Sequence, residues 1–152
     1  MVKEALESGR ISQLVGYSQI RAEVPYGTNS RIDFLARGKG LPDTYIEVKN
    51  VHLLRSEDWA EFPDSVTARG AKHLGELMRV VDEGARAVML YLVQRTDCTR
   101  FRLAGDIDPA YATAFDAARS AGVEMLCYGT EISVEGVRLA GELPVDEALQ
   151  SP

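Results

Sequence analysis

The sequence predicts an α/β domain in which helices flank a mixed β-sheet. Three strand-like segments follow one another with short turns between them, and two further apolar strand-like segments alternate with helices. The chain has 152 residues, of which 45% are hydrophobic, which is enough for one domain with a sizeable core. We expect this domain to cover residues 1–141 and residues 142–152 to form a flexible tail.

The first part of the chain predicts one helix and three strands. Residues 2–8 favour a short helix that stops at Gly9. Because the connections between the strands are short, an antiparallel meander is the expected arrangement. The strand-like segments are 17–24, 30–36 and 44–51, and the turn signals between them are Pro25-Tyr26-Gly27 and Gly38-Lys39-Gly40.

A helix and a central strand are expected next. A loop containing Phe62-Pro63-Asp64 leads into a predicted helix over 66–82, which ends at Gly84. Residues 85–94 are almost continuously apolar, which is typical of a strand covered on both faces.

The next helix has the clearest boundaries in the sequence. Asp108 stands at the N-cap position, Pro109 at the first helical position, and Gly122 just past the end. Residues 123–128 predict a further buried strand, and residues 131–139 an edge strand.

Composition bounds the function classes. The net charge of −6 counts against a simple basic nucleic-acid-binding module, because binding phosphates normally requires clustered Lys and Arg. Neither a GxGxxG nor a phosphate-loop motif is present, and no apolar stretch approaches the ~20 residues of a membrane span. Cys98 and Cys127 lack metal-type spacing, so a disulfide is possible but unsupported. We expect a cytoplasmic protein without membrane association, and the oligomeric state stays open.

Two strand segments carry the residues that suggest chemistry. Strand alternation places Glu47 and Lys49 on one face, with Ile46 and Val48 on the other. Asp33, on the preceding strand, points away from its apolar neighbours, so pairing of the two strands can bring it to the same surface.

This set suits metal-assisted phosphodiester hydrolysis. Carboxylates such as Asp33 and Glu47, with the Val48 carbonyl as a further ligand, suit Mg²⁺ or Mn²⁺. Lys49 would orient the attacking water or stabilise the transition state. The alternative is an exposed polar face of a half-solvated sheet, on which such spacings are common.

The predicted helix over 66–82 carries a polar stripe. Arg69, Lys72, His73 and Glu76 follow one another at helical spacing, and they form either a solvated face or a phosphate-binding face directed at the metal site. The opposing apolar surface is predicted to consist of Val66, Leu74, Leu77, Met78 and Val81.

Other residues are secondary candidates. Glu4 could add a carboxylate from the first helix, although an ordinary surface role is favoured, and Gln94 could contact a metal-bound water at the end of the central strand. His52 is expected to be structural or exposed. Trp59 and Phe62 are expected to serve as packing anchors, with stacking on nucleic acid as the alternative.

These segments resemble the sugar fermentation stimulation protein family of bacteria and archaea, and the resemblance covers roughly residues 2–128 in order. The matching segments are Gly16-Tyr17, Asn29-Ser30-Arg31-Ile32-Asp33-Phe34-Leu35, Tyr45-Ile46-Glu47-Val48-Lys49-Asn50-Val51, Phe62-Pro63-Asp64-Ser65-Val66-Thr67, Arg69-Gly70-Ala71-Lys72-His73-Leu74, Val93-Gln94-Arg95 and Ile107-Asp108-Pro109-Ala110-Tyr111.

The resemblance implies a protein in two parts, an N-terminal OB-like DNA-binding domain and a C-terminal domain with a restriction-endonuclease-like PD-(D/E)XK core. This chain resembles the second part only. Asp33, Glu47 and Lys49 match the metal and catalytic positions, and Ile32 stands where the strict motif has proline. The stretch Arg69-Gly70-Ala71-Lys72-His73 matches a helix motif of the family. Two functions follow as expectations: a Mg²⁺- or Mn²⁺-dependent nuclease acting on nucleic acid, with DNA as the expected class, or a non-cleaving DNA-binding regulator of sugar (maltose) metabolism.

Overall fold

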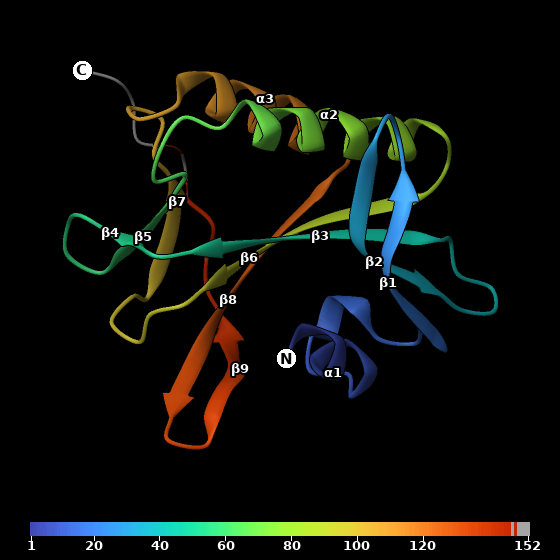
Figure 1. Cartoon of the computed structure of the whole chain (residues 1–152), viewed down its shortest axis with the longest axis horizontal. Helices are drawn as coiled ribbons and strands as arrows, with labels where there is room; N and C mark the ends of the chain where they lie inside the picture. The colour runs from blue at the N-terminus through green and yellow to red at the C-terminus, as the bar shows by residue number, and fades with distance from the viewer. Residues whose placement is uncertain (147, 149–152) are drawn as a thin grey trace.

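The protein is built around a six-stranded mixed sheet with the strand order β1-β2-β3-β6-β8-β9 (Figure 1). The computed structural model describes residues 1–146 and 148. β1, β2 and β3 form the expected antiparallel meander, β3, β6 and β8 run parallel, and β9 pairs antiparallel with β8. The strands are β1 (Gln19–Tyr26), β2 (Ser30–Arg37), β3 (Thr44–Val51), β6 (Arg86–Val93), β8 (Glu124–Ser133) and β9 (Gly136–Glu142).

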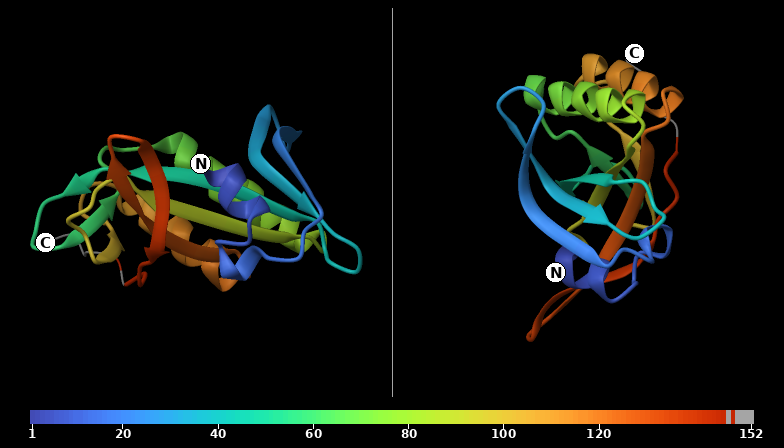
Figure 2. Two further views of the ribbon diagram at one scale, coloured as in Figure 1. Left: turned by 90° about the horizontal axis from the view of Figure 1, so that it is seen from below. Right: turned by 90° about the vertical axis from the view of Figure 1, so that its right-hand side faces the viewer.

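The helices cover the two faces of this sheet. α2 (Ala68–Asp82) and α3 (Pro109–Ser120) lie together on one face, whereas α1 (Val2–Glu7) and a short 3-10 helix (Ser12–Leu14) lie on the other (Figures 1 and 2). Each face therefore buries its own apolar cluster. β6 lies between the two apolar clusters and is buried over almost its whole length, as its continuous apolar sequence predicts.

A second, three-stranded sheet was not expected from the sequence. It consists of β4 (Leu53–Leu54), β5 (Trp59–Phe62) and β7 (Arg100–Leu103). Such short strands show too little alternation to stand out. Trp59 packs against the guanidinium groups of Arg100 and Arg102, with centroid distances of 3.9 and 4.6 Å. Its ring therefore has a packing role, as does that of Phe62, which packs against Tyr91 and Tyr111.

Both long helices begin at side-chain caps. The Asp108 carboxylate accepts the Tyr111 amide at 3.0 Å, and Gly122 follows α3 with φ +107°, as predicted. α2 begins two residues later than predicted because the Thr67 hydroxyl caps it by accepting the Gly70 amide at 3.0 Å. Val66 consequently lies outside the helix and is 75% exposed, so its predicted place on the apolar face of α2 is wrong.

The turns and the C-terminal segment differ from the sequence prediction. β1 runs through Tyr26, so the first turn is shifted towards Asn29. β8 and β9 pair along a hairpin that turns between Ser133 and Gly136. Residues 142–146 are packed rather than loose. The Phe101 amide donates to the Pro144 carbonyl, and the Phe101 carbonyl accepts the Asp146 amide. The rest of the predicted tail, apart from residue 148, lies outside the described residues.

Within the described residues, no helix is long and apolar enough to cross a membrane. Cys98 and Cys127 are both free thiols in the structure.

Asp108 joins the starts of the two long helices, because its second carboxylate oxygen accepts the Thr67 amide at 2.8 Å. Asp108→Ala should lower the free energy of unfolding by about 3 kcal/mol, since one helix cap and one buried charge-assisted hydrogen bond are lost together. Urea unfolding measures this change. Asp116→Ala, at an exposed position on α3, is the matched control and should stay within about 0.5 kcal/mol of the wild type. Equal losses in the two variants would contradict the assignment.

Candidate metal centre

The candidate site lies where β2 leaves β3. Pairing between these strands ends at Phe34 and Ile46, although β3 continues beside β6 as far as Val51. Continued, the same register would place Asp33 opposite Glu47 and Ile32 opposite Val48. Instead, the Asp33 carboxylate accepts the Val48 amide at 2.7 Å. A side chain thus replaces the backbone partner that the sheet no longer supplies, and the sheet opens at Asp33.

The Val48 backbone faces this opening. The Asp43 and Val51 carbonyls accept from the amides of Arg86 and Gln94, so the odd-numbered residues of β3 bond towards β6. Amide and carbonyl of one strand residue point to the same side, and Val48 therefore directs both groups towards β2. Its carbonyl oxygen lies on the same edge as the Asp33 carboxylate, where a hard cation could use it as a ligand.

Glu47 is a buried acid beside Asp33. Glu47 is only 4% exposed, and its Oε2 atom has no hydrogen-bond partner within the part of the chain that the structure describes. Burial, followed by the adjoining Asp33 carboxylate, raises the pKa of Glu47 to about 8, although the charges of Lys49 and Arg69 act in the opposite direction. The two carboxylates therefore share a strongly negative, poorly solvated site that favours either a proton or a cation.

Lys49 is the third residue of the site, after Asp33 and Glu47, and its side chain contacts helix α2. Its ammonium group lies 3.0 Å from His73 Nδ1. Burial lowers the pKa of Lys49, while the neighbouring Glu47 and Asp33 charges oppose this effect. Burial and the charges of Lys49 and Arg69 also lower the pKa of His73. A neutral His73 accepts a hydrogen bond from Lys49, so its position supports the lysine.

The polar stripe predicted on α2 divides in the structure. Arg69 is exposed on the first turn, close enough for its charge to act on Glu47 and His73. Lys72 instead contacts the β1–β2 hairpin, because its ammonium donates to the Thr28 carbonyl at 2.9 Å. His73 is only 6% exposed and lies against the Lys49 ammonium.

Tyr26 is a residue of this site that the sequence interpretation missed, and Glu76, which it placed on the polar stripe of α2, is buried beside Tyr26. The buried Glu76 carboxylate accepts the Ser30 hydroxyl at 2.9 Å and lies 3.7 Å from the Lys72 ammonium. Tyr26 points its hydroxyl into the same region, and its pKa is raised by burial and by the charges of Glu47 and Glu76. A Cβ on Gly27 would come within 2.8 Å of the Glu76 carboxyl carbon, so the hairpin packs directly on this acid. No local pattern marks these contacts, which join residues far apart in sequence.

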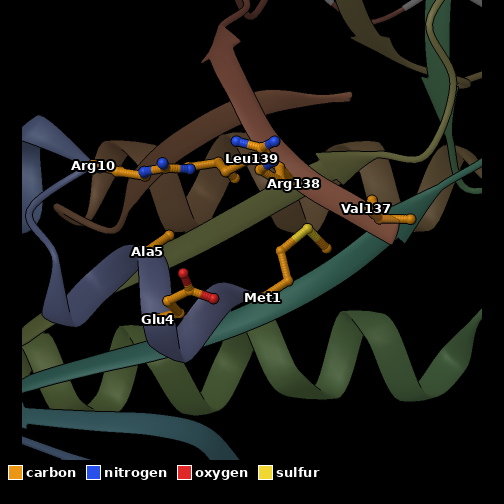
Figure 3. A pocket seen from close by; sticks show the side chains of 7 residues that line it. All are labelled: Met1, Glu4, Ala5, Arg10, Val137, Arg138 and Leu139. Atoms are coloured by element: carbon orange, nitrogen blue, oxygen red, sulfur yellow. The ribbon is translucent and has the colours of Figure 1, made fainter. Parts of the chain in front are cut away.

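The secondary candidates separate in space. Gln94 lines the same groove as Asp33 and Val48, and its amide donates to Asn50 Oδ1 at 3.1 Å. Glu4 lines a different pocket, between α1 and β9, whose lining includes Arg10 and Arg138 (Figure 3). His52 was expected to be either structural or exposed, and it is exposed. Among the described residues no group of three His, Cys, Asp or Glu side chains converges on one point, so the candidate donors are two carboxylates and a carbonyl.

The fold and the site define a mixed α/β domain whose sheet opens onto a pair of carboxylates. The family model described as "Sugar fermentation stimulation protein RE domain" matches residues 1–136, and the chain belongs to this family. It is 70% identical over 152 residues to the sugar fermentation stimulation protein homolog of Dinoroseobacter shibae, and 64% identical over 152 residues to that of a Jannaschia species. These matches cover 100% and 99% of the chain but only 62% and 63% of the relatives' own length.

A solved structure is also similar. The structure of Pyrococcus furiosus SfsA in complex with Ca²⁺ matches with a TM-score of 0.85 and 28% sequence identity. The match covers 95% of this chain and 62% of that one.

The Glu47 carboxyl makes the stability of the metal-free protein depend on pH. Its pKa is about 8 in the folded protein against a reference value of 4.5, so between these values the folded state holds a proton that the unfolded chain releases. The free energy of unfolding should therefore fall as the pH rises from about 5 to about 8. Urea unfolding at several pH values in the presence of a chelator measures this slope.

Glu47→Gln removes the titrating group and should flatten that slope. Glu131→Gln, at an exposed position of β8, is the matched control and should keep the wild-type slope. Parallel curves for the wild type and Glu47→Gln would show that Glu47 does not titrate in this range.

Proposed function

We propose that this domain is a metal-dependent nuclease with a restriction-endonuclease-like PD-(D/E)XK core, which hydrolyses phosphodiester bonds in nucleic acid. The observation that carries the proposal is the meeting of Asp33 and Glu47 at the opening of the sheet, next to Lys49. A purely structural sheet gains nothing from placing a part-buried carboxylate beside a buried one, because each destabilises the charge of the other.

The residues present fit a divalent cation. Asp33, Glu47 and the Val48 carbonyl offer hard oxygen donors, and Glu47 Oε2 is buried without a partner among the described residues. The complex of Pyrococcus furiosus SfsA with Ca²⁺ supports a divalent-cation site in the family. We propose Mg²⁺ or Mn²⁺ as the working ion of this chain. When bound, such a cation lowers the pKa of a coordinated water and offsets negative charge on the phosphate.

The remaining residues supply hydrogen bonds and positive charge. The Lys49 ammonium donates to the attacking water or to a phosphate oxygen, and His73 holds it by accepting one of its three N–H groups. Arg69, exposed on the first turn of α2, binds a phosphate oxygen near the site. Lys72 has a structural role in this proposal, since it already bridges Thr28 and Glu76.

We propose DNA as the substrate of the longer protein. The chain spans just over three fifths of the length of its relatives, and an OB-like domain beyond this segment would supply the basic surface that a net charge of −6 does not. The domain described here would then provide the cleavage site, and its partner domain most of the affinity.

Asp33→Asn and Glu47→Gln should each reduce Mn²⁺-dependent cleavage by at least about a hundredfold, because each removes a charged cation ligand. Lys49→Met should reduce the rate at saturating Mn²⁺ without weakening cation binding. Labelled single- and double-stranded DNA and RNA are the substrates, and gel electrophoresis measures the cleavage rate.

Lys39→Met, at an exposed loop position, is the matched control for Lys49→Met and should cleave at the wild-type rate. Metal-dependent cleavage that persists in both carboxylate variants would overturn the proposal, since another protein or another site would then be responsible.

The alternative function is a non-cleaving DNA-binding regulator of sugar (maltose) metabolism, and the name of the family favours it. It predicts DNA binding that a chelator does not change and that weakens steeply with salt. Fluorescence anisotropy with and without EDTA separates the two functions. Absence of DNA binding by the longer protein would exclude the regulator.

A further inference from the structure

We propose that a groove on the α1 side of Asp33 binds an unpaired nucleobase, which makes a single-stranded or frayed nucleic-acid strand the substrate. The inference rests on the proposed function, because the groove shares Asp33 and Val48 with the candidate metal centre. A phosphodiester held at that centre carries a nucleoside on either side. The groove is therefore placed to receive one of the two adjoining bases.

The groove has the dimensions of a small-molecule site. It has a volume of about 520 Å³, within the usual range for ligand pockets. Asn50 and Gln94 line it from the C-terminal ends of β3 and β6, and Lys3 lines it from α1. It lies on the opposite face of the sheet from Lys49 and His73, with Asp33 shared between the two faces.

Its lining favours a flat, neutral group. Phe34, Val48 and Leu92 supply apolar surface that belongs to, or packs on, the α1-side core, and a base can stack against such surface. Asp33 and Glu23 also line the groove, so that two acids outweigh the one base, Lys3, and the lining disfavours a second phosphate. A neutral aromatic ring can stack on the apolar surface and carries no negative charge.

Two amide side chains can read the edge of such a ring. Gln94 Nε2 donates to Asn50 Oδ1 at 3.1 Å, and this bond orients both groups. Gln94 Oε1 and Asn50 Nδ2 have no further hydrogen bond within the described residues, so these two neighbouring side chains keep one acceptor and one donor available. Nucleobase edges that carry a donor next to an acceptor match this pair, as in the known contacts of Asn and Gln with adenine.

A base that enters the groove cannot remain stacked and paired in a duplex. Taking it out of a duplex costs unstacking and unpairing free energy, which a single strand largely avoids. The inference thus predicts a preference for unpaired nucleotides at the cleavage position.

The test measures binding of a short labelled DNA strand in Ca²⁺ by fluorescence anisotropy. The same strand with abasic nucleotides and the matching duplex are measured in parallel. The wild type should bind the intact strand about tenfold more tightly than the abasic strand or the duplex. Gln94→Ala and Asn50→Ala should each weaken binding of the intact strand about tenfold, and they should add no further loss on the abasic strand.

Gln19→Ala, an exposed amide on β1, is the matched control and should bind like the wild type. Thermal unfolding of each variant checks that the fold is retained, and two separate groove variants guard against a local defect in one. Equal binding of intact and abasic strands, or equal binding by Gln94→Ala and Gln19→Ala, would overturn the inference.

Cleavage assays in Mn²⁺ separate this inference from the proposed function. Equally fast cleavage of duplex and single strand, unchanged by Gln94→Ala, overturns the base site and leaves the nuclease standing. Base-dependent binding by the chain without any cleavage overturns the nuclease alone. Failure of the chain and of the longer protein to bind or cleave any nucleic acid overturns both.

Discussion

The hydrogen bond from the Val48 amide to the Asp33 carboxylate is the contact on which the site depends. β2 has to leave β3 for the sheet to open, and an amide left unpaired in a part-buried position would cost about 1–3 kcal/mol. Asp33 removes that cost with one carboxylate oxygen, and under the proposed function the other oxygen would bind the cation. The proposed function therefore gives this one side chain both a structural and a chemical role.

The opening also explains how acidic groups can occupy a buried position. Glu47 lies against Asp33 with little solvent to screen the two charges, and Lys49 and Arg69 compensate only part of their repulsion. The remaining negative potential is what a divalent cation would neutralise. His73 accepts a hydrogen bond from Lys49. It thereby restrains the Lys49 ammonium group without adding a charge of its own.

A second set of contacts ties the β1–β2 hairpin to α2. Glu76 receives the Ser30 hydroxyl, and Lys72 bridges from Glu76 to the Thr28 carbonyl. Because Ser30 begins the strand that carries Asp33, these contacts help to fix the position of that strand relative to α2. The α2 stripe is thus shared between two tasks: Arg69 and His73 adjoin the carboxylate site, while Lys72 and Glu76 hold the hairpin.

The sequence was sufficient to predict those elements that interactions between neighbouring residues determine. The caps of α3 and the apolar run of β6 were predicted because capping and periodicity involve neighbouring residues. The short strands of the second sheet were missed, as were the packing of residues 142–146 and the later start of α2, because these depend on partners far away in the chain or on one hydroxyl.

Strand alternation predicted from the sequence alone that Asp33, Glu47 and Lys49 can meet on one surface. Only the tertiary structure decided how these three side chains are held. It ended the β2–β3 ladder at Phe34, so that Asp33 could bind the Val48 amide, and it packed α2 over Lys49, so that His73 supports the lysine. These outcomes depend on where one strand leaves another and on which helix covers the gap, and neither is encoded in the spacing of residues along a single segment.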